Sequence, residues 1–117
     1  MEFDINRIDD VIHGRVRLGI IAYLSTAEAA DFNELKGLLE ATAGNLSVHL
    51  RKLEEAGYIT VTKSFVSRKS LTRVQITKTG RQAFAKYLAQ VRALVDSHGA
   101  STPSSAVRTE PTSRKRA

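Results

Sequence analysis

The segment from Thr42 to Thr77 restricts the possible folds more than any other part of the chain. Residues 43–56 carry leucines at helical spacing, and Gly57 follows where such a helix would end. Two runs rich in β-branched residues come next, at 58–63 and 71–77, with basic residues between them. The segment therefore predicts a short helix followed directly by a basic β-hairpin.

Three other stretches have apolar residues at the spacing of a helix, at 6–25, 34–41 and 78–97. We expect Asn33 to cap the second of these helices. The break between it and the next helix is short and contains a glycine, which is typical of a helix-turn-helix. The leucines of the second helix should face the core; they are Leu35, Leu38 and Leu39.

The predicted elements follow one another as helix, very short strand at 31–32, helix, helix, strand, wing, strand and helix. This is the order of a winged helix-turn-helix domain, mostly α-helical with a small β-hairpin wing (α+β). The run SFVSRKS between the hairpin strands is too long for a two-residue turn, so we expect a flexible wing tip.

The domain should cover residues 1–97. Small, polar and proline residues dominate residues 98–117, which predicts a disordered basic tail.

Charge is distributed unevenly along the chain, which has a net charge of +6. Residues 1–60 hold six basic and ten acidic side chains, whereas residues 61–95 hold eight basic side chains and no acidic one. Such an asymmetry indicates a polyanionic partner. A solvated basic surface without a partner explains the basic charge alone equally well. The same two alternatives apply to the basic residues of the tail.

Several functional classes are not predicted. The absence of cysteine excludes disulfides, thiolate metal sites and cysteine catalysis, and the three histidines are too far apart for metal-ligand spacing. The chain has no nucleophile–base–acid set and no glycine-rich phosphate loop, so we expect neither an enzyme nor a cofactor. It has no run of about 18 apolar residues and no signal pattern. We therefore expect a cytoplasmic protein that does not associate with membranes.

The helix predicted at 43–56 has two different faces. At about 100° per residue, Leu46, Leu50 and Leu53 fall on one side, which should be buried. The opposite side is small, polar and basic, so it should be exposed. His49 flanks the apolar side, where we expect a packed and hydrogen-bonded histidine rather than a ligand.

Three segments resemble the winged helix transcriptional regulators of the MarR and ArsR types. They are IHGRVRLGIIAYL (12–24), DFNELKGLLEATAGNLSVHLRKLEEAGYI (31–59) and VQITKTGRQAF (74–84). The resemblance implies a homodimer that binds a pseudo-palindromic operator in double-stranded DNA. It places the helix at 43–56 in the major groove and the wing on the backbone or in the minor groove. Metal sensing is not implied, because the cysteine ligands of metal-sensing ArsR proteins are missing.

These expectations select DNA-contacting residues on one helix and on the wing. Asn45 suits an adenine edge, Val48 a thymine methyl, and Arg51 either a guanine edge or a phosphate. Capping of the helix start is the alternative role for Asn45 and Ser47. Lys52 and the wing cations suit phosphates, and the wing tip also suits the minor groove. The predicted set is Asn45, Ser47, Val48, Arg51, Lys52, Lys63, Arg68, Lys69 and Arg73.

The last helix has an apolar stripe that is wide for a domain of this size. If the stripe were exposed in a monomer, it would form an apolar patch that needs cover. The resemblance also implies dimerisation through the first and last helices. The predicted dimer residues are Ile8, Val11, Ile12, Tyr87, Leu88, Val91, Leu94 and Val95. No residue requires a small-molecule effector.

A winged helix that binds proteins and not DNA is the main alternative function. The outer face of its third helix should then be acidic or apolar. In this chain that face holds Arg51 and Lys52, and the wing has no acidic residue. We therefore favour a sequence-specific DNA-binding regulator over an interaction module.

Overall fold

The computed structural model describes residues 5–99. It confirms the predicted order of helices and strands, with one additional 3-10 turn before the first helix. The elements are η1 (Ile5–Arg7), α1 (Arg15–Ala27), β1 (Ala29–Asp31), α2 (Phe32–Leu39), α3 (Ala43–Glu55), β2 (Ile59–Val66), β3 (Lys69–Ile76) and α4 (Lys78–Gly99).

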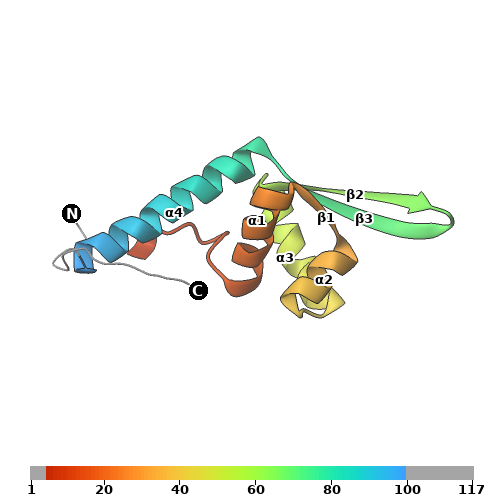
Figure 1. Cartoon of the computed structure of the whole chain (residues 1–117), viewed down its shortest axis with the longest axis horizontal. Coiled ribbons are helices and arrows are strands. Elements are labelled where there is room, and N and C mark those ends of the chain that lie inside the picture. Colours follow the sequence, from red (N-terminus) through yellow and green to blue (C-terminus); the bar gives the residue numbers. More distant parts are fainter. Residues whose placement is uncertain (1–4, 100–117) are drawn as a thin grey trace, which may run out of the picture.

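The molecule is elongated, with extents of 58 × 33 × 24 Å. Helices α1, α2 and α3 form a cluster, from which the β2–β3 hairpin projects on one side and α4 extends on the other (Figure 1). The three strands form an antiparallel sheet in the order β1-β3-β2. Because β1 pairs only with residues 73–75 of β3, the distal hairpin stands alone as the wing.

The main core lies between α1, α2, α3 and the base of the sheet. Leu46, Leu50 and Leu53 are buried in it, as the helical spacing predicts. No polar or charged residue is fully buried between residues 5 and 99. Burial of this apolar ridge fixes the rotation of α3 about its axis, so the polar face of the helix must point to solvent.

A second apolar cluster joins the N-terminal segment to α4. Its buried members are Ile8, Ile12 and Tyr87. Two polar contacts accompany it: the Tyr58 hydroxyl donates to Asp9 Oδ2 at 2.7 Å, and His13 Nδ1 lies 2.9 Å from the Tyr87 hydroxyl oxygen. The N-terminal segment is therefore held along α4.

The helix expected at 6–25 begins later than predicted, at Arg15. The carboxylate of Asp9 accepts hydrogen bonds from the backbone N–H groups of Val11 (2.8 Å) and Ile12 (3.3 Å). An aspartate that bonds nearby N–H groups in this way favours a turn over a helix. The apolar residues at 8–12 consequently reach α4 from a turn.

The predicted start of α2 was also wrong, because Asp31 and not Asn33 caps the helix. The Asp31 side chain accepts from the Glu34 N–H at 2.7 Å, and the Glu34 carboxylate accepts from the Asp31 N–H at 3.4 Å. These two bonds form a capping box. Leu35 is buried as expected, but Leu38 is 52% exposed, because this short helix packs through its Leu35 side.

The wing tip is a tight turn and not the longer flexible loop that we predicted. Val66 pairs with Lys69, so only Ser67 and Arg68 connect the strands. Their φ angles are 52° and 69°, and two positive φ values are the requirement of a type I′ turn. Residues 62–70 are exposed on both faces, so the distal strands lack the apolar alternation that reveals a strand.

The start of α4 is fixed against the corner between α3 and β2. The Thr77 hydroxyl donates to the Gly57 carbonyl at 2.6 Å and accepts from the Gly80 N–H at 2.9 Å. Gly57 has a φ of 82°, which confirms it as the glycine that ends the preceding helix. A Cβ on Gly80 would lie 2.1 Å from the Tyr58 carbonyl oxygen, so only glycine permits this contact.

The far end of α4 reaches Gly99. The first two residues of the tail predicted at 98–117 thus continue the helix. The rest of that tail, at 100–117, lies outside the described residues, and so do residues 1–4.

Candidate nucleic-acid interface

The outer face of α3 begins at a well-formed helix cap. Thr42 accepts a hydrogen bond from the Asn45 backbone N–H at 3.1 Å, so Thr42 is the capping residue. Within residues 5–99 the side chains of Asn45 and Ser47 make no hydrogen bond, and both residues are exposed. Capping therefore does not occupy either side chain, and both remain available to a partner.

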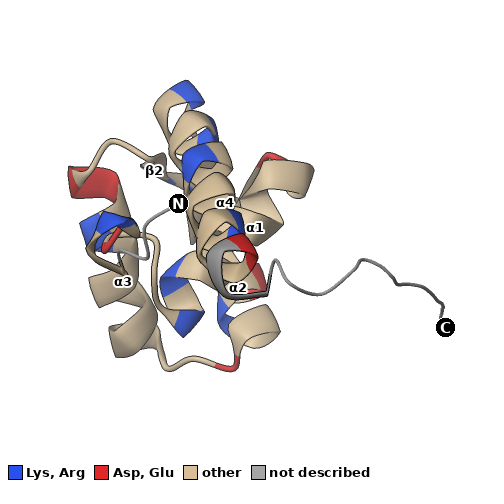
Figure 2. Ribbon diagram, turned by 90° about the vertical axis from the view of Figure 1, so that its left-hand side faces the viewer, with Lys and Arg blue, Asp and Glu red and all other residues tan. Residues whose placement is uncertain are grey.

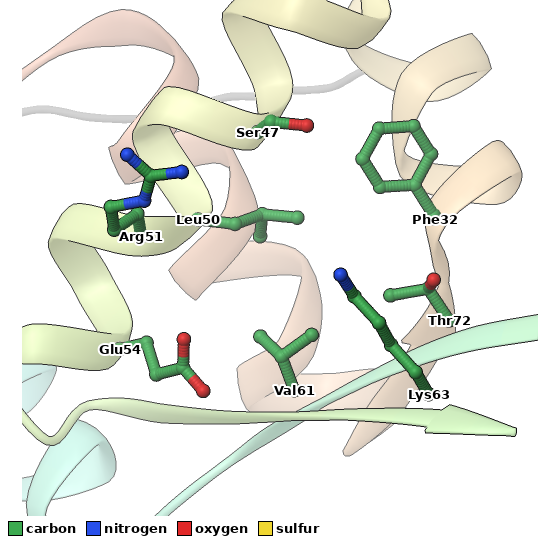
Figure 3. Close-up of a pocket in the computed structure, with 8 residues that line it drawn as sticks. All are labelled: Phe32, Ser47, Leu50, Arg51, Glu54, Val61, Lys63 and Thr72. Carbon is green, nitrogen blue, oxygen red and sulfur yellow. The ribbon is translucent and has the colours of Figure 1, made fainter.

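A groove runs beside this face, between α3, the start of α2 and the base of the wing (Figure 3). Its volume is about 360 Å³. Arg51 and Glu54 lie on its α3 side, and Lys63 reaches into it from β2 (Figure 3). The complete lining is Phe32, Ser47, Leu50, Arg51, Glu54, Val61, Lys63 and Thr72. Three predicted DNA-contacting residues, from two elements, thus share one concave surface.

Lys52 lies on a different flank of α3. It lines a second cavity of about 390 Å³, together with Asp10, Arg17 and Glu55. This surface carries both charges, and it faces the N-terminal segment. The structure therefore separates Lys52 from the groove that holds Arg51.

The remaining predicted residues lie on the wing. Arg68 occupies the turn, and Lys69 begins β3 directly after it. Lys63 pairs with Thr72, whereas Arg73 pairs with Thr62, so the two cations lie on opposite faces of the hairpin. The sequence alone does not fix the direction of Lys63, but the strand register does: Lys63 shares the face of the groove, and Arg73 does not.

The predicted DNA-contacting cations lack carboxylate partners in the part of the chain described. The ion pair found between residues 5 and 99 joins Arg92 to Asp96 on α4, at 3.9 Å. Lys and Arg residues also recur along α4 (Figure 2). The positive charge of α3 and the wing is therefore available to an anionic partner.

Arg17 holds α3 to the N-terminal segment, a role that no local sequence pattern reveals. Its Nε donates to the Val11 carbonyl at 2.6 Å, and its Nη2 lies 3.4 Å from the Asp10 carbonyl oxygen. On the other side, Nη1 lies 2.9 Å from His49 Nδ1. Arg17 thus links the segment along α4 with the helix that carries the candidate interface.

The Arg17 contact requires His49 to accept a hydrogen bond at Nδ1, so the imidazole must be neutral there. Partial burial lowers the pKa of His49, and the nearby charges of Arg17, Lys52 and Arg15 lower it further. The expected hydrogen-bonded histidine at the edge of the core is confirmed.

The predicted dimer residues divide into two groups. Ile8, Ile12 and Tyr87 are buried inside the chain's own second cluster, so they do not need a partner to cover them. Val11, Val91 and Leu94 are partly buried beside the two clusters. Leu88 is 50% exposed and Val95 is 61% exposed. The N-terminal segment therefore covers one side of the apolar stripe, and its outer side stays open.

The described residues contain no group of three or more His, Asp or Glu side chains arranged to hold a metal ion. Among the same residues, no helix combines the length and apolar character needed to cross a membrane.

Known proteins are similar to this chain in sequence and in fold. A family described as a winged helix DNA-binding domain matches residues 16–95. An uncharacterized protein of Methanocaldococcus jannaschii is 40% identical over 81 residues, which make up 69% of this chain and 88% of that protein. The structure of a transcriptional regulator homologue from Pyrococcus horikoshii OT3 is 32% identical, with a TM-score of 0.69 over 74% of this chain and 86% of the other.

A MarR-like transcriptional regulator from Thermotoga maritima is 24% identical, with a TM-score of 0.51 over 68% of this chain and 56% of the other. At this identity the likeness shows the fold alone. It agrees with the resemblance seen in the sequence. The chain belongs to the winged helix DNA-binding domain family and has the fold of MarR-like transcriptional regulators.

Proposed function

We propose that the protein is a sequence-specific transcriptional regulator that binds a pseudo-palindromic operator as a homodimer. One observation carries this proposal: the polar outer face of α3 continues through a groove into a hairpin without acidic residues. In this arrangement α3 enters the major groove, whose width of about 12 Å accepts a helix. The wing then lies on the backbone or in the adjacent minor groove. Such a regulator works on the chromosome, in the cytoplasm.

In the proposed complex, the first half of α3 reads the bases. Asn45, Ser47 and Val48 are exposed near the start of the helix, where recognition helices contact base edges. Arg51 lies one turn later, in the groove, and has a second cation opposite it in Lys63. We assign Arg51 to a guanine edge and Lys63 to a phosphate.

The other cations contact the DNA backbone. Lys52 lies on the far flank of α3, so it suits the phosphates along one wall of the major groove. Arg68 and Lys69 occupy the end of the wing. Arg73 lies on the opposite face of the hairpin, which makes it the weakest contact of the predicted set. These contacts set affinity and register, and they do not read sequence.

The outer side of α4 is the proposed dimer surface. Leu88 and Val95 are exposed large apolar residues two turns apart on this helix, so they lie on one stripe. Two copies that join through this stripe would carry their α3 helices to half-sites about 10 base pairs apart, or a multiple of that spacing. Val91 lies between the two exposed residues and extends the surface.

A pair of substitutions tests the DNA-binding proposal on a duplex selected from random sequences. Arg51→Ala should weaken binding by about 1–3 kcal/mol and relax the preference at one base position. Lys69→Ala should weaken binding to all sequences alike and reduce the salt slope by about one unit. Equal small losses for both variants would instead show non-specific binding.

Sedimentation tests the dimer. At micromolar concentration the wild type should sediment at about twice its mass of 12.9 kDa. Leu88→Glu should shift it to a monomer, because a charge is costly in an apolar contact. Leu38→Glu on α2 is the matched control, since Leu38 is exposed to the same degree. A wild type that sediments as a clean monomer would remove dimerisation from the proposal.

A further inference from the structure

The distal wing carries three exposed apolar side chains that the contacts above do not use. Phe65 is 79% exposed, and its neighbour Val66 is 56% exposed. Leu71, on the opposite strand, is also exposed. By the strand register, Phe65 lies on one face of the hairpin, and Val66 and Leu71 lie on the other. Single exposed apolar residues are common on proteins, but a side chain as large and as exposed as Phe65 at the end of a projecting hairpin is a candidate contact for a partner. All three lie next to the turn, in the distal half of the hairpin, and this hairpin projects away from the body (Figure 1).

Phe65 lies on the face of the hairpin that continues the α3 groove. Alternation along β2 places Val61, Lys63 and Phe65 on one face. Val61 and Lys63 line the groove beside α3. Phe65 therefore faces the same side as Lys63, and it stands about 7 Å further out along the strand. A duplex held against α3 would meet this face.

The length of the wing matches the spacing of the DNA grooves. Ser67 follows Val61 by six positions, which corresponds to roughly 20 Å of extended chain. Half a helical turn of DNA, the step from the major groove to the next minor groove, is about 17 Å. With α3 in the major groove, the end of the wing therefore reaches the adjacent minor groove.

The charge around Phe65 favours DNA over a protein as the partner. Lys63 precedes Phe65, and Arg68 and Lys69 follow it, with no acidic residue anywhere in 61–95. Arg68 also holds a φ of 69°, a conformation that glycine or asparagine adopts at lower cost. The turn thus keeps an arginine three positions from Phe65 in spite of this strain. An arginine beside an apolar wedge is the combination with which proteins enter and kink a minor groove.

We propose that Phe65 is an apolar wedge that inserts at a base step in the minor groove, so that the wing reads the deformability of the DNA. This inference rests on the proposed function. Pyrimidine–purine steps kink most easily. The operator should therefore favour a TA or CA step beneath the wing, although no side chain need read the base edges there.

Two duplexes test the wedge. Both contain the selected half-sites and differ only beneath the wing, where one carries a TA step and the other a stiff A-tract. Affinity is measured by fluorescence anisotropy, and bending by energy transfer between the duplex ends. The wild type should bend the TA duplex and bind it about tenfold more tightly than the A-tract duplex, the scale of one altered base pair.

Three variants separate a wedge from a simple contact. Phe65→Ala should lose both the bend and the preference for the TA duplex, whereas Phe65→Leu, which keeps an apolar side chain, should retain most of each. Leu71→Ala should behave as the wild type, because Leu71 pairs with Ser64 on the other face of the hairpin. Since all these positions are exposed, unchanged thermal melting should show that each variant folds.

The outcomes distinguish the wedge from the function on which it rests. A wild type that binds no duplex overturns the proposed function, and the wedge with it. If the wild type binds but bends neither duplex, the wedge alone is overturned. The same conclusion follows if Phe65→Ala keeps the preference for the TA duplex, or if it weakens binding to both duplexes equally.

Discussion

Replacement of Arg17 by methionine should destabilise the domain strongly, because this side chain joins the N-terminal segment to α3. Methionine keeps the helix propensity and the apolar part of the side chain. The substitution removes the 2.6 Å bond to the Val11 carbonyl and the 2.9 Å bond to His49. Hydrogen bonds of charged groups contribute roughly 1.5–3 kcal/mol each. Arg17 is only half buried, so the low end applies, and the expected loss is about 3 kcal/mol.

Arg15→Met provides the matched control on the same helix. Arg15 donates one exposed hydrogen bond to the Leu39 carbonyl, at 3.2 Å. An exposed bond of this kind should contribute about 0.5 kcal/mol. Both variants remove one positive charge, so the difference between them isolates the contacts of Arg17.

Urea unfolding at a fixed protein concentration measures both effects, with a slope of roughly 1–3 kcal/mol per molar urea. The midpoint for Arg17→Met should fall by 1 M or more on the scale of that slope, and that for Arg15→Met by much less. A double-mutant cycle with His49→Ala should give a coupling of about 1 kcal/mol between the two side chains. If the free energies of unfolding of Arg17→Met and Arg15→Met agree within about 0.5 kcal/mol, Arg17 does not link the N-terminal segment to α3.

Three further predictions concern single residues. Gly80→Ala should cost several kcal/mol of stability or prevent folding, because the added Cβ would lie 2.1 Å from the Tyr58 carbonyl oxygen. Gly37→Ala has open space around it and should stabilise α2 by up to about 1 kcal/mol, so the melting temperatures of the two variants should shift in opposite directions. The pKa of His49 is lowered in the fold, so the contribution of His49 to stability should be complete above pH 6.5 and decline as the pH falls below that value. Unfolding of the wild type and of His49→Gln between pH 7.5 and 5 measures this contribution, and parallel pH profiles of the two proteins would contradict the prediction. Burial and the hydrogen bond to Asp9 raise the pKa of Tyr58 from 10.0 to about 12. The wild type should therefore be more stable than Tyr58→Phe by an amount that is complete below pH 10 and declines as the pH rises toward 12. A stability difference that stays constant in urea titrations at alkaline pH would refute this prediction.

The order of elements was predictable because it depends on local patterns. The helical spacing of Leu46, Leu50 and Leu53 defines both a helix and its buried face, and the structure buries all three. Gly57 likewise marks the end of that helix by its conformational freedom alone. Such signals need no knowledge of the rest of the fold.

The predictions for the start of the first helix and for the wing tip were wrong. In both places the structure depends on a contact distant in sequence or on strands exposed on both faces. Ile8 and Ile12 have helical spacing, yet they reach α4 from a turn that Asp9 stabilises. The distal strands have solvent on both faces, so their apolar residues show no alternation.

The candidate interface was predictable only in part, for the same reason. The exposed face of α3 follows from its buried ridge, so Asn45, Ser47 and Arg51 could be selected from the sequence. The contact between Arg17 and His49 spans 32 positions, and no short pattern encodes it. The direction of Lys63 depends on the β2–β3 register, which the sequence did not define at the wing. The roles of these residues on DNA remain predictions.

Selection of bound duplexes from a random pool by the full-length wild type most directly tests whether α3 and the wing form a dimeric DNA reader. The protein should enrich one short half-site in two inverted copies, with centres about 10 base pairs or a multiple of that distance apart. A pool that stays random after repeated rounds, or that yields a motif without two-fold symmetry, would contradict the account.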